Sequence, residues 1–410
     1  MPATFIDKDL TLKFVTPENN TRDEGIKYWY QSDEKGNRIL KYSMGMSVLY
    51  APFFFVAHVL AGPLGYQPDG FSDIYEFFIE FSGLFYLLFG LIYLRKLLLK
   101  FYGEKIVAFT LVLIFFGTNV LYYATADAAM SHTYTFSLFS VFLYYVFSFY
   151  EKATVKNTLI LALCFGLIIL VRPVNILLIL PFLFFGIDHV KDVSSCLNFV
   201  LGHYKYALLF IIITVLLVLP QLIYYKYVTG HYLVFSYGKE GFFFNRFHLW
   251  DVLFSFRKGW LIYTPIMLFA FCGFWYMRSQ VSKVFSTGLF ILFPVYMYVV
   301  SSWWCWWYGG SFSQRSFIDI YPLLALPLAA FLFKLQSFDN GRKIIIYIVV
   351  MFMLLLNIFQ TFQYKYNIID YDGMTAKEYV QVFGTLDEKK IDTTLLDKPN
   401  YERALQGLEE

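Results

Sequence analysis

Four basic residues stand beside long apolar stretches in a chain that carries few charges. Arg315 follows "WWYGGSFSQ", Arg172 lies inside "LIILVRPVNILLILP", and Arg257 and Lys258 precede "GWLIYTPIM". A guanidinium group is always charged and binds phosphate through two parallel hydrogen bonds. The pattern therefore indicates a binding site for a lipid phosphate. Its alternative is a set of juxtamembrane charges that extend to the headgroups of the bilayer.

A run of aromatic residues lies directly before Arg315. Gly309 and Gly310 follow the run and allow a tight turn, and we expect a helix to begin near Ser316 with its positive dipole end outward. Aromatic residues form belts at membrane interfaces, but four tryptophans within five residues exceed what a belt needs, and indole faces pack well on sugar rings. We therefore predict a wall for a sugar or an acceptor, formed by Trp303, Trp304, Trp306, Trp307 and Tyr308.

One carboxylate and one histidine stand together in "YYATADAAMSHTYTF". Asp127 lies five residues before His132, in a short turn between two apolar stretches. A carboxylate in such a turn can accept or orient a proton in a transfer reaction. It can equally cap the next helix, and the histidine can be structural. We assign both residues as candidate catalytic residues and keep the structural alternatives open.

Motifs for cofactors and metals do not occur in the sequence. There is no phosphate-binding glycine loop, no metal-ligand spacing and no nucleophile elbow. Acidic residues do not cluster, so we expect neither a cofactor nor a divalent metal. No compact basic and aromatic surface segment indicates a nucleic-acid partner. The cysteines are far apart and are expected to be small core residues; they are Cys164, Cys196, Cys272 and Cys305.

The composition indicates the solvent in which this chain folds. Of its 410 residues 58% are hydrophobic and only 15% are charged, whereas a soluble domain has roughly 25% charged residues. Runs such as "YALLFIIITVLLVLPQLIYY" reach the length of about 20 apolar residues that crosses a bilayer. We predict an all-α, polytopic transmembrane bundle of about ten spans: 74–97, 104–124, 131–150, 157–171, 173–187, 204–226, 261–278, 284–302, 316–335 and 343–364.

Three regions follow from the distribution of polar residues. Residues 1–73 form an external segment that contains the apolar stretch "MGMSVLYAPFFFVAHVLAG" (44–62), which we interpret as an interfacial or re-entrant helix broken by Pro52. Residues 74–364 form the bundle. Residues 365–410 form a polar tail, which is expected to lie outside as well.

Lysine and arginine in the short loops predict the orientation, because they accumulate on the cytoplasmic side. The opposite short loops hold only Arg172 and Arg315, which places the active face outside a cytoplasmic (inner) membrane. Both chain ends are then outside, yet the first residues contain no signal sequence. We expect that the chain starts downstream of a first transmembrane helix; the alternative is a span count off by one. The cytoplasmic loops carry Arg95, Lys96, Lys100, Lys105, Lys152, Lys156, Lys191, Lys205, Arg278, Lys283, Lys334, Arg342 and Lys343.

Five segments in order resemble the GT-C integral-membrane glycosyltransferases. They are "KYSMGMSVLYAPFFFVAH" (41–58), "DAAMSHTYTFSLF" (127–139), "LVRPVN" (170–175), "FSFRKGWLIYTPIM" (254–267) and "WWYGGSFSQRSFIDIYPLLALPLA" (306–329). More narrowly, the series is similar to bacterial relatives of the protein O-mannosyltransferases and of the aminoarabinose–lipid A transferase. It spans most of the chain, from Lys41 to about residue 335.

The resemblance implies a cell-envelope enzyme that takes a sugar from a polyprenyl-phosphate carrier and passes it to a glycan, lipid or protein. Arg172 and Arg315, aided by Arg257 or Lys258, would stabilise the departing phosphate. Lys41 and Tyr42, in the first motif, are added to the wall for the sugar or acceptor. In the family an aspartate early in the first external loop acts as general base. Here "MPATFIDKDL" looks like the continuation of that loop, so the base is expected to be absent and Asp127 to orient the acceptor.

Two other functions remain open at this point. A transporter or flippase for a lipid-linked sugar would use the same basic site without chemistry. It should place polar groups at the bilayer midplane and broken helices in paired halves, but no clear inverted repeat is present and polar residues gather at the outer ends. A non-catalytic accessory membrane subunit is the third interpretation.

Overall fold

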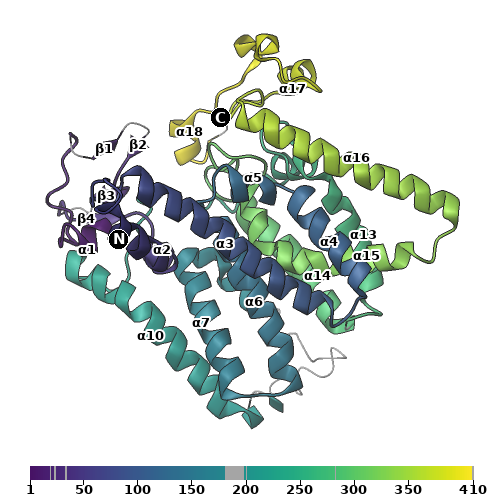
Figure 1. Ribbon diagram of the computed structural model, residues 1–410, viewed down its shortest axis with the longest axis horizontal. Helices are drawn as coiled ribbons and strands as arrows, with labels where there is room; N and C mark the ends of the chain where they lie inside the picture. The colour runs from purple at the N-terminus through teal and green to yellow at the C-terminus, as the bar shows by residue number, and fades with distance from the viewer. Residues whose placement is uncertain are drawn as a thin grey trace.

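Helices packed side by side make up most of the molecule (Figure 1). The computed structural model describes residues 1–18, 20–22, 25–32, 35–180, 198–199, 201–281 and 283–408. The longer helices are α2 (Gly45–Ala61), α3 (Asp73–Leu98), α4 (Glu104–Phe116), α6 (Ser131–Glu151), α7 (Val155–Val171), α10 (Tyr204–Thr229), α13 (Leu268–Met277), α14 (Lys283–Ser301), α15 (Tyr321–Leu335) and α16 (Asn340–Lys365).

Short elements connect and cover these helices. Within the described ranges the only strands form two antiparallel hairpins in the first 40 residues, so the all-α prediction agrees with the structure. The hairpins pair β1 (Thr21–Arg22) with β2 (Gly25–Ile26) and β3 (Tyr30–Ser32) with β4 (Arg38–Leu40). The short helices are α1 (Pro2–Phe5), α5 (Val120–Thr125), α11 (Leu249–Phe254), α12 (Trp260–Tyr263), α17 (Ala376–Val382) and α18 (Tyr401–Leu405), with 3-10 turns η1 (Pro173–Ile179), η3 (Pro265–Met267), η4 (Arg315–Ile320), η5 (Glu388–Lys390) and η6 (Thr393–Leu395).

Four helical segments of the described chain are long and apolar enough to cross a membrane. They are α3, α10, α16 and the continuous segment Arg315–Leu335, which joins η4 to α15. Four shorter apolar helices accompany them. Helices of this length and composition indicate an integral membrane protein, whereas the predicted number of ten spans is not confirmed by them.

Several predicted spans are interrupted near one end. The segment 104–124 divides at Gly117 into α4 and α5, and 261–278 divides at Pro265 into α12, η3 and α13. Helix α7 ends at Val171 because the residue before a proline is disfavoured in the α region, and η1 then begins at Pro173. Residues 181–187 of the predicted span 173–187, Lys191 and Cys196 lie outside the described residues.

Helix α2 differs from its prediction. It runs without a break through Pro52; a proline inside a helix removes one backbone hydrogen bond but does not have to end the helix. Its first turn packs directly on the end of α7, where an added side chain on Gly45 would lie 2.5 Å from the Leu170 carbonyl carbon. The Ser43 hydroxyl donates a hydrogen bond to the Leu170 carbonyl oxygen. The start of α2 is therefore anchored at Leu170, one residue before Val171 and two before Arg172.

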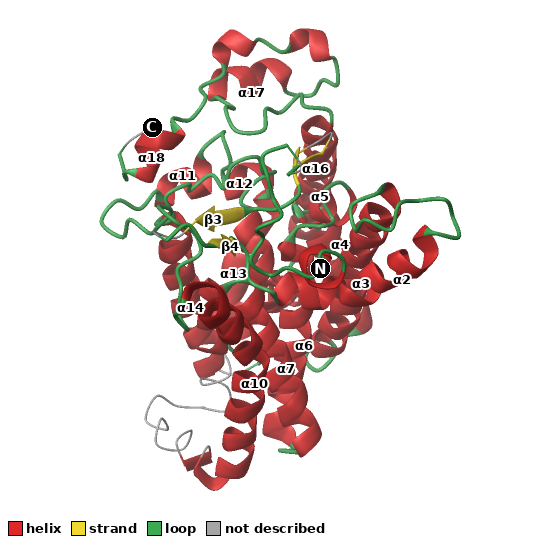
Figure 2. Ribbon diagram, turned by 90° about the vertical axis from the view of Figure 1, so that its left-hand side faces the viewer, coloured by secondary structure: helices red, strands yellow, loops and turns green. Residues whose placement is uncertain are grey.

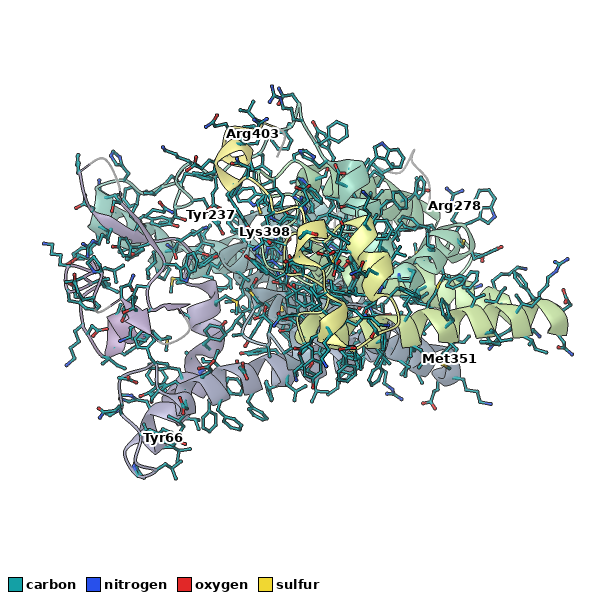
Figure 3. The ribbon with its side chains drawn as sticks, turned by 90° about the horizontal axis from the view of Figure 1, so that it is seen from above. Tyr66, Tyr237, Arg278, Met351, Lys398 and Arg403 are labelled. Carbon is teal, nitrogen blue, oxygen red and sulfur yellow. The ribbon has the colours of Figure 1, made fainter. Side chains whose placement is uncertain are left out.

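The loops predicted for the two sides of a membrane lie at opposite ends of the bundle. At one end, Lys100 Nζ lies 2.8 Å from Glu151 Oε1, which joins the α3–α4 loop to the end of α6. At the other end lie the loops that carry Arg172 and Arg315, since α7 ends at Val171 and η4 precedes α15. The tail, residues 366–408, lies at the top of the molecule in Figure 2. Seen from above, the tail, with Lys398 labelled, lies over the centre of the bundle (Figure 3).

Helix α15 is the centre of the bundle, and nearly all of it is buried. Its Pro327 carbonyl touches the neighbouring helix α13, where a side chain added to Gly273 would come within 1.7 Å of the Pro327 oxygen. Phe269 and Phe331 stack beside this contact with ring centroids 4.8 Å apart. The close approach of α13 and α15 therefore requires glycine at position 273.

We expect Gly273→Ala to lower the free energy of unfolding by about 1–3 kcal/mol, because the backbones of α13 and α15 must move apart. The measurement is unfolding by SDS titration in mixed micelles. Gly62→Ala is the matched control, since nothing lies within 4 Å of its added carbon. An equal stability of the two variants would contradict the packing described here.

Candidate functional site

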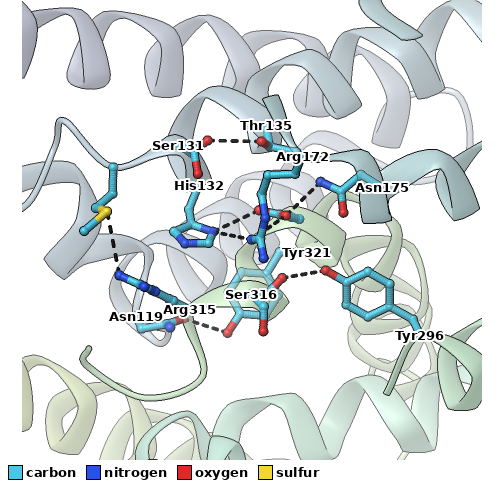
Figure 4. A network of polar contacts seen from close by, with 12 residues as sticks. Asn119, Ser131, His132, Thr135, Arg172, Asn175, Tyr296, Arg315, Ser316 and Tyr321 are labelled. Atoms are coloured by element: carbon cyan, nitrogen blue, oxygen red, sulfur yellow. Dashed lines mark hydrogen bonds and ion pairs between the residues drawn. The ribbon is translucent and has the colours of Figure 1, made fainter. Parts of the chain in front are cut away.

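A buried carboxylate, Asp319, organises the polar groups at the tail end of the bundle (Figure 4). It has no exposed surface. One oxygen, Oδ2, accepts hydrogen bonds from Arg172 Nη1 at 2.9 Å and from Asn175 Nδ2 at 2.8 Å. The other, Oδ1, lies 3.1 Å from His132 Nδ1. Three partners from three different segments therefore neutralise and orient one carboxylate.

Interruptions in the helices bring these side chains together. Arg172 is the first residue after α7 and has an extended backbone, with φ −146° and ψ 104°. Asn175 follows in η1, His132 lies in the first turn of α6, and Asp319 lies in η4 just before α15. A continuous helix through Pro173 would point Arg172 and Asn175 in other directions. The proline at 173 is thus a condition for the site.

His132 is part of this network and is almost completely buried. Its Nδ1 lies 3.1 Å from Asp319 Oδ1 and 3.0 Å from Arg172 Nη1. A ring nitrogen either donates or accepts, so Nδ1 can serve only one of these partners at a time. The geometry gives His132 a positioning role between the carboxylate and the guanidinium.

Arg315 differs from Arg172 because it forms no ion pair or hydrogen bond with an acid among the described residues. Figure 4 shows the two arginines on opposite sides of His132. Arg315 is half-buried, and in the described part of the chain its only hydrogen-bond acceptor is the thioether sulfur of Met130, at 3.7 Å. Sulfur is a weak acceptor. The guanidinium therefore retains most of its capacity to bind an anion.

Asp127 lies in the turn between α5 and α6, and its carboxyl group interacts electrostatically with Arg315. The turn is closed by its backbone, since Met130 N donates to the Asp127 carbonyl oxygen at 3.1 Å. The residue that caps α6 is Met130, and no side chain caps this helix, so the helix-cap interpretation of Asp127 does not hold. Burial raises the pKa of the Asp127 carboxyl, and the positive charge of Arg315 opposes this rise.

Buried polar atoms without protein partners lie on the two residues before Arg315 in the chain and on Asn175. Among the described residues, Ser313 Oγ, Gln314 Oε1 and Asn175 Oδ1 are buried and make no hydrogen bond. The amide nitrogen of Gln314 is used, because it donates to the Trp306 carbonyl oxygen at 3.1 Å. Buried polar atoms are rarely left unpaired. These atoms are therefore suited to pair with a polar ligand or water.

Arg257 and Lys258 are turned toward the tail. Arg257 Nη2 donates to the Asp397 backbone oxygen at 2.9 Å and lies 3.3 Å from its carboxylate. Lys258 is 1% exposed, and its Nζ donates to the backbone oxygens of Ser311 and Tyr371. Burial lowers the pKa of Lys258 to about 7. Both residues hold the tail against the loop that contains the tryptophans.

The tryptophan cluster, Trp303, Trp304, Trp306 and Trp307, packs between the tail and the loop before α11. Trp303 meets Phe242 with ring centroids 4.7 Å apart, and Trp306 stacks on His248 at 5.7 Å. The cluster ends at Tyr308, which has a positive φ of 60° followed by φ 64° at Gly309. The tight turn expected at Gly309 is thus present and begins one residue earlier.

Lys41 and Tyr42 lie beyond Trp303, on the side of the first external segment. Lys41 Nζ is 2.5 Å from Glu240 Oε1 and 5.6 Å from the centroid of the Tyr237 ring. Tyr237 also meets Tyr42 at 6.2 Å and Trp303 at 5.8 Å. The two residues are connected to the tryptophan cluster through Tyr237.

Asp319 is the site residue that the sequence analysis missed. It stands four residues after Arg315 in an apolar run, "SFIDIYPLL". An acidic residue inside a membrane-embedded helix is costly and normally has a partner, and this rule would have identified it. Its partner Arg172 lies 147 positions earlier in the chain, which only the fold reveals.

No protein-family model matches the sequence, and no curated protein matches it. Within the described residues, no group of three or more histidine, cysteine or acidic side chains is placed to hold a metal ion.

We expect Asp319→Asn to lower the free energy of unfolding by about 3 kcal/mol or more, because it leaves the Arg172 charge buried without its counter-ion. SDS titration in mixed micelles again measures the change. The control is Asp339→Asn, which breaks an exposed pair with Arg342 and should change stability little. A small effect of Asp319→Asn would mean that Arg172 is neutralised by another group.

Proposed function

We propose that this chain is a membrane glycosyltransferase of the GT-C type, which transfers a sugar from a polyprenyl-phosphate carrier to an acceptor outside the cytoplasmic membrane. The observation that carries the proposal is Arg315, a half-buried guanidinium without an acidic partner among the described residues. The two residues before it in the chain, Ser313 and Gln314, carry buried polar atoms that lack hydrogen-bond partners within the described structure. A phosphate with a sugar attached offers an anion to Arg315 and hydroxyl groups to the unpaired polar atoms.

In this reaction the bond between the anomeric carbon and the phosphate oxygen breaks, and a bond to an acceptor oxygen or nitrogen forms. Negative charge grows on the leaving phosphate, where Arg315 stabilises it in a water-poor site. The acceptor loses a proton, and Asp127, near Arg315 and raised in pKa by burial, is the described carboxylate suited to orient the acceptor or take that proton.

Arg172 has a supporting role in the proposal. Its charge is shared with Asp319, so it contributes less to phosphate binding than its type suggests. The pair instead fixes the end of α7 and the start of η4, and η4 begins with Arg315. A rigid support of this kind keeps the binding group in place as charge develops.

The arrangement of loops supports the finer parts of the proposal. A bundle of about ten spans, with the site facing outward, explains why the loops rich in lysine and arginine lie at the end opposite to Arg315. Membrane lipids, the lipid-linked sugar and a glycan, lipid or protein acceptor are the partners that such a site requires.

We expect Arg315→Ala to reduce kcat/KM for transfer by about 100-fold or more, since removal of one donor to a developing anion has effects of this size. The assay follows a radiolabelled sugar from polyprenyl phosphate to endogenous acceptors in membranes. Arg342→Ala, which removes an exposed arginine, should keep full activity. Near-normal transfer by Arg315→Ala would refute the assignment, and carrier binding without transfer in the unaltered chain would favour a transporter.

The pH dependence of transfer tests Asp127. If the ionised carboxylate is required, activity falls as the pH drops through its pKa, which burial places above the usual aspartate value of 3.8. We therefore expect an acid limb above pH 3.8 in kcat/KM, lost together with most of the activity in Asp127→Asn. The same acid limb in Asp127→Asn would assign the titration to another group.

A further inference from the structure

A small cavity lies between the tryptophan cluster and the end of the tail. Its walls include all four tryptophans of the cluster, and Ala404, Gly407 and Leu408 of the tail close it. Its volume is about 10 Å³, which is roughly enough for one water molecule. Nothing as large as a sugar ring fits while the tail is in this position.

The walls of this cavity carry a hydrogen-bond donor that is not used. The indole nitrogen of Trp304 is buried and has no acceptor in hydrogen-bond geometry within the described structure, whereas the indole N–H of Trp307 is directed to the Tyr401 hydroxyl of the tail. An indole N–H can only donate, and a buried donor without a partner is costly. A ligand that brings oxygen atoms to this surface would relieve that cost.

The chemical character of the walls favours a saccharide. Flat indole faces pack against apolar C–H surfaces, and the unpaired N–H of Trp304 matches a hydroxyl or ring oxygen. A sugar ring offers apolar C–H groups on its faces and oxygen atoms on its edge. A lipid chain would leave the Trp304 donor unpaired.

The contacts of the tail show how it covers the cavity. The Tyr401 ring lies against Trp304 and Trp307, with centroids 6.2 Å and 5.5 Å away. Arg246 donates to the Gly407 carbonyl oxygen. Gly407 has a positive φ of 65°, and a side chain there would come within 2.5 Å of the Phe243 ring. The end of the tail is thus held by the ring contacts of Tyr401, by its hydrogen bond to Asp372 at 3.0 Å, and by the contacts of Gly407.

We propose that the tryptophan cluster is a saccharide-binding site and that residues 401–408 occupy it as a removable cover. The choice of a saccharide rests on the proposed function. The site is formed by the cluster and the loop before α11, apart from the phosphate-binding guanidinium of Arg315. Movement of α18 away from the cluster opens it, and Figure 2 shows α18 at the outer edge of the molecule.

The test is Gly407→Val, which disfavours the left-handed backbone and collides with Phe243, so that α18 leaves the cluster. Gly384→Val is the matched control, because Gly384 also lies in the tail with a positive φ of 71° but has nothing within 4 Å. Acrylamide quenching of tryptophan fluorescence reports uncovering. Titration with uncharged methyl glycosides of hexoses and pentoses reports binding.

We expect stronger quenching in Gly407→Val and a Kd at least tenfold lower for one or more glycosides than in the unaltered chain, with no change in Gly384→Val. Trp304→Phe, added to Gly407→Val, should weaken that binding about fivefold or more, because it keeps an aromatic ring and removes the indole N–H. Arg246→Gln removes the guanidinium that donates to the Gly407 carbonyl oxygen. It is the second uncovering variant, to be used if Gly407→Val fails to fold.

Unchanged quenching in both uncovering variants would overturn the cover, and stronger quenching without glycoside binding would overturn the saccharide site. Binding of a neutral glycoside depends neither on a lipid phosphate nor on sugar transfer, so it is measured independently of the proposed function. If transfer proves absent while glycosides bind to the uncovered cluster, only the proposed function fails; if transfer is present and no glycoside binds, only this inference fails.

Discussion

The pairing of Asp319 with Arg172 is the interaction on which the end of the bundle depends. A carboxylate with no exposed surface is unstable unless opposite charge and hydrogen bonds surround it, and Asp319 has both from Arg172, Asn175 and His132. The three partners come from α6, from the residue after α7 and from η1. Each of these segments must therefore keep its position beside Asp319 so that the carboxylate remains ionised inside the protein.

This constraint separates the four basic residues, which look alike in sequence. Arg172 is paired with Asp319, Arg257 contacts Asp397, and Lys258 donates to two backbone oxygens. Arg315 hydrogen-bonds only to a sulfur atom within the described structure. Three of the four charges thus hold protein segments together through hydrogen bonds to oxygen, and Arg315 does not.

The sequence predicts the helices better than their interactions. Apolar length identifies α3, α10 and α16, and Pro173 correctly marks the end of α7, because both signals are local. The break predicted at Pro52 was wrong. Helix α2 continues through this residue, because its packing on α7 stabilises it despite the backbone hydrogen bond that proline cannot donate. Asp319 and the contacts of Lys258 were missed because their partners lie far away along the chain. Local patterns cannot show which distant groups neutralise a charge.

The tail illustrates the same limit and has a consequence for the site. Its composition is that of a polar external segment, which suggests a dispensable end as readily as a packed one. In the structure, Asp397, Tyr371 and Gly407 receive hydrogen bonds from Arg257, Lys258 and Arg246, so the basic residues next to the tryptophans are satisfied by the tail. Arg257 also lies within 6 Å of the rings of both Trp306 and Trp307. Its contact with Asp397 therefore ties the tail to the tryptophan cluster.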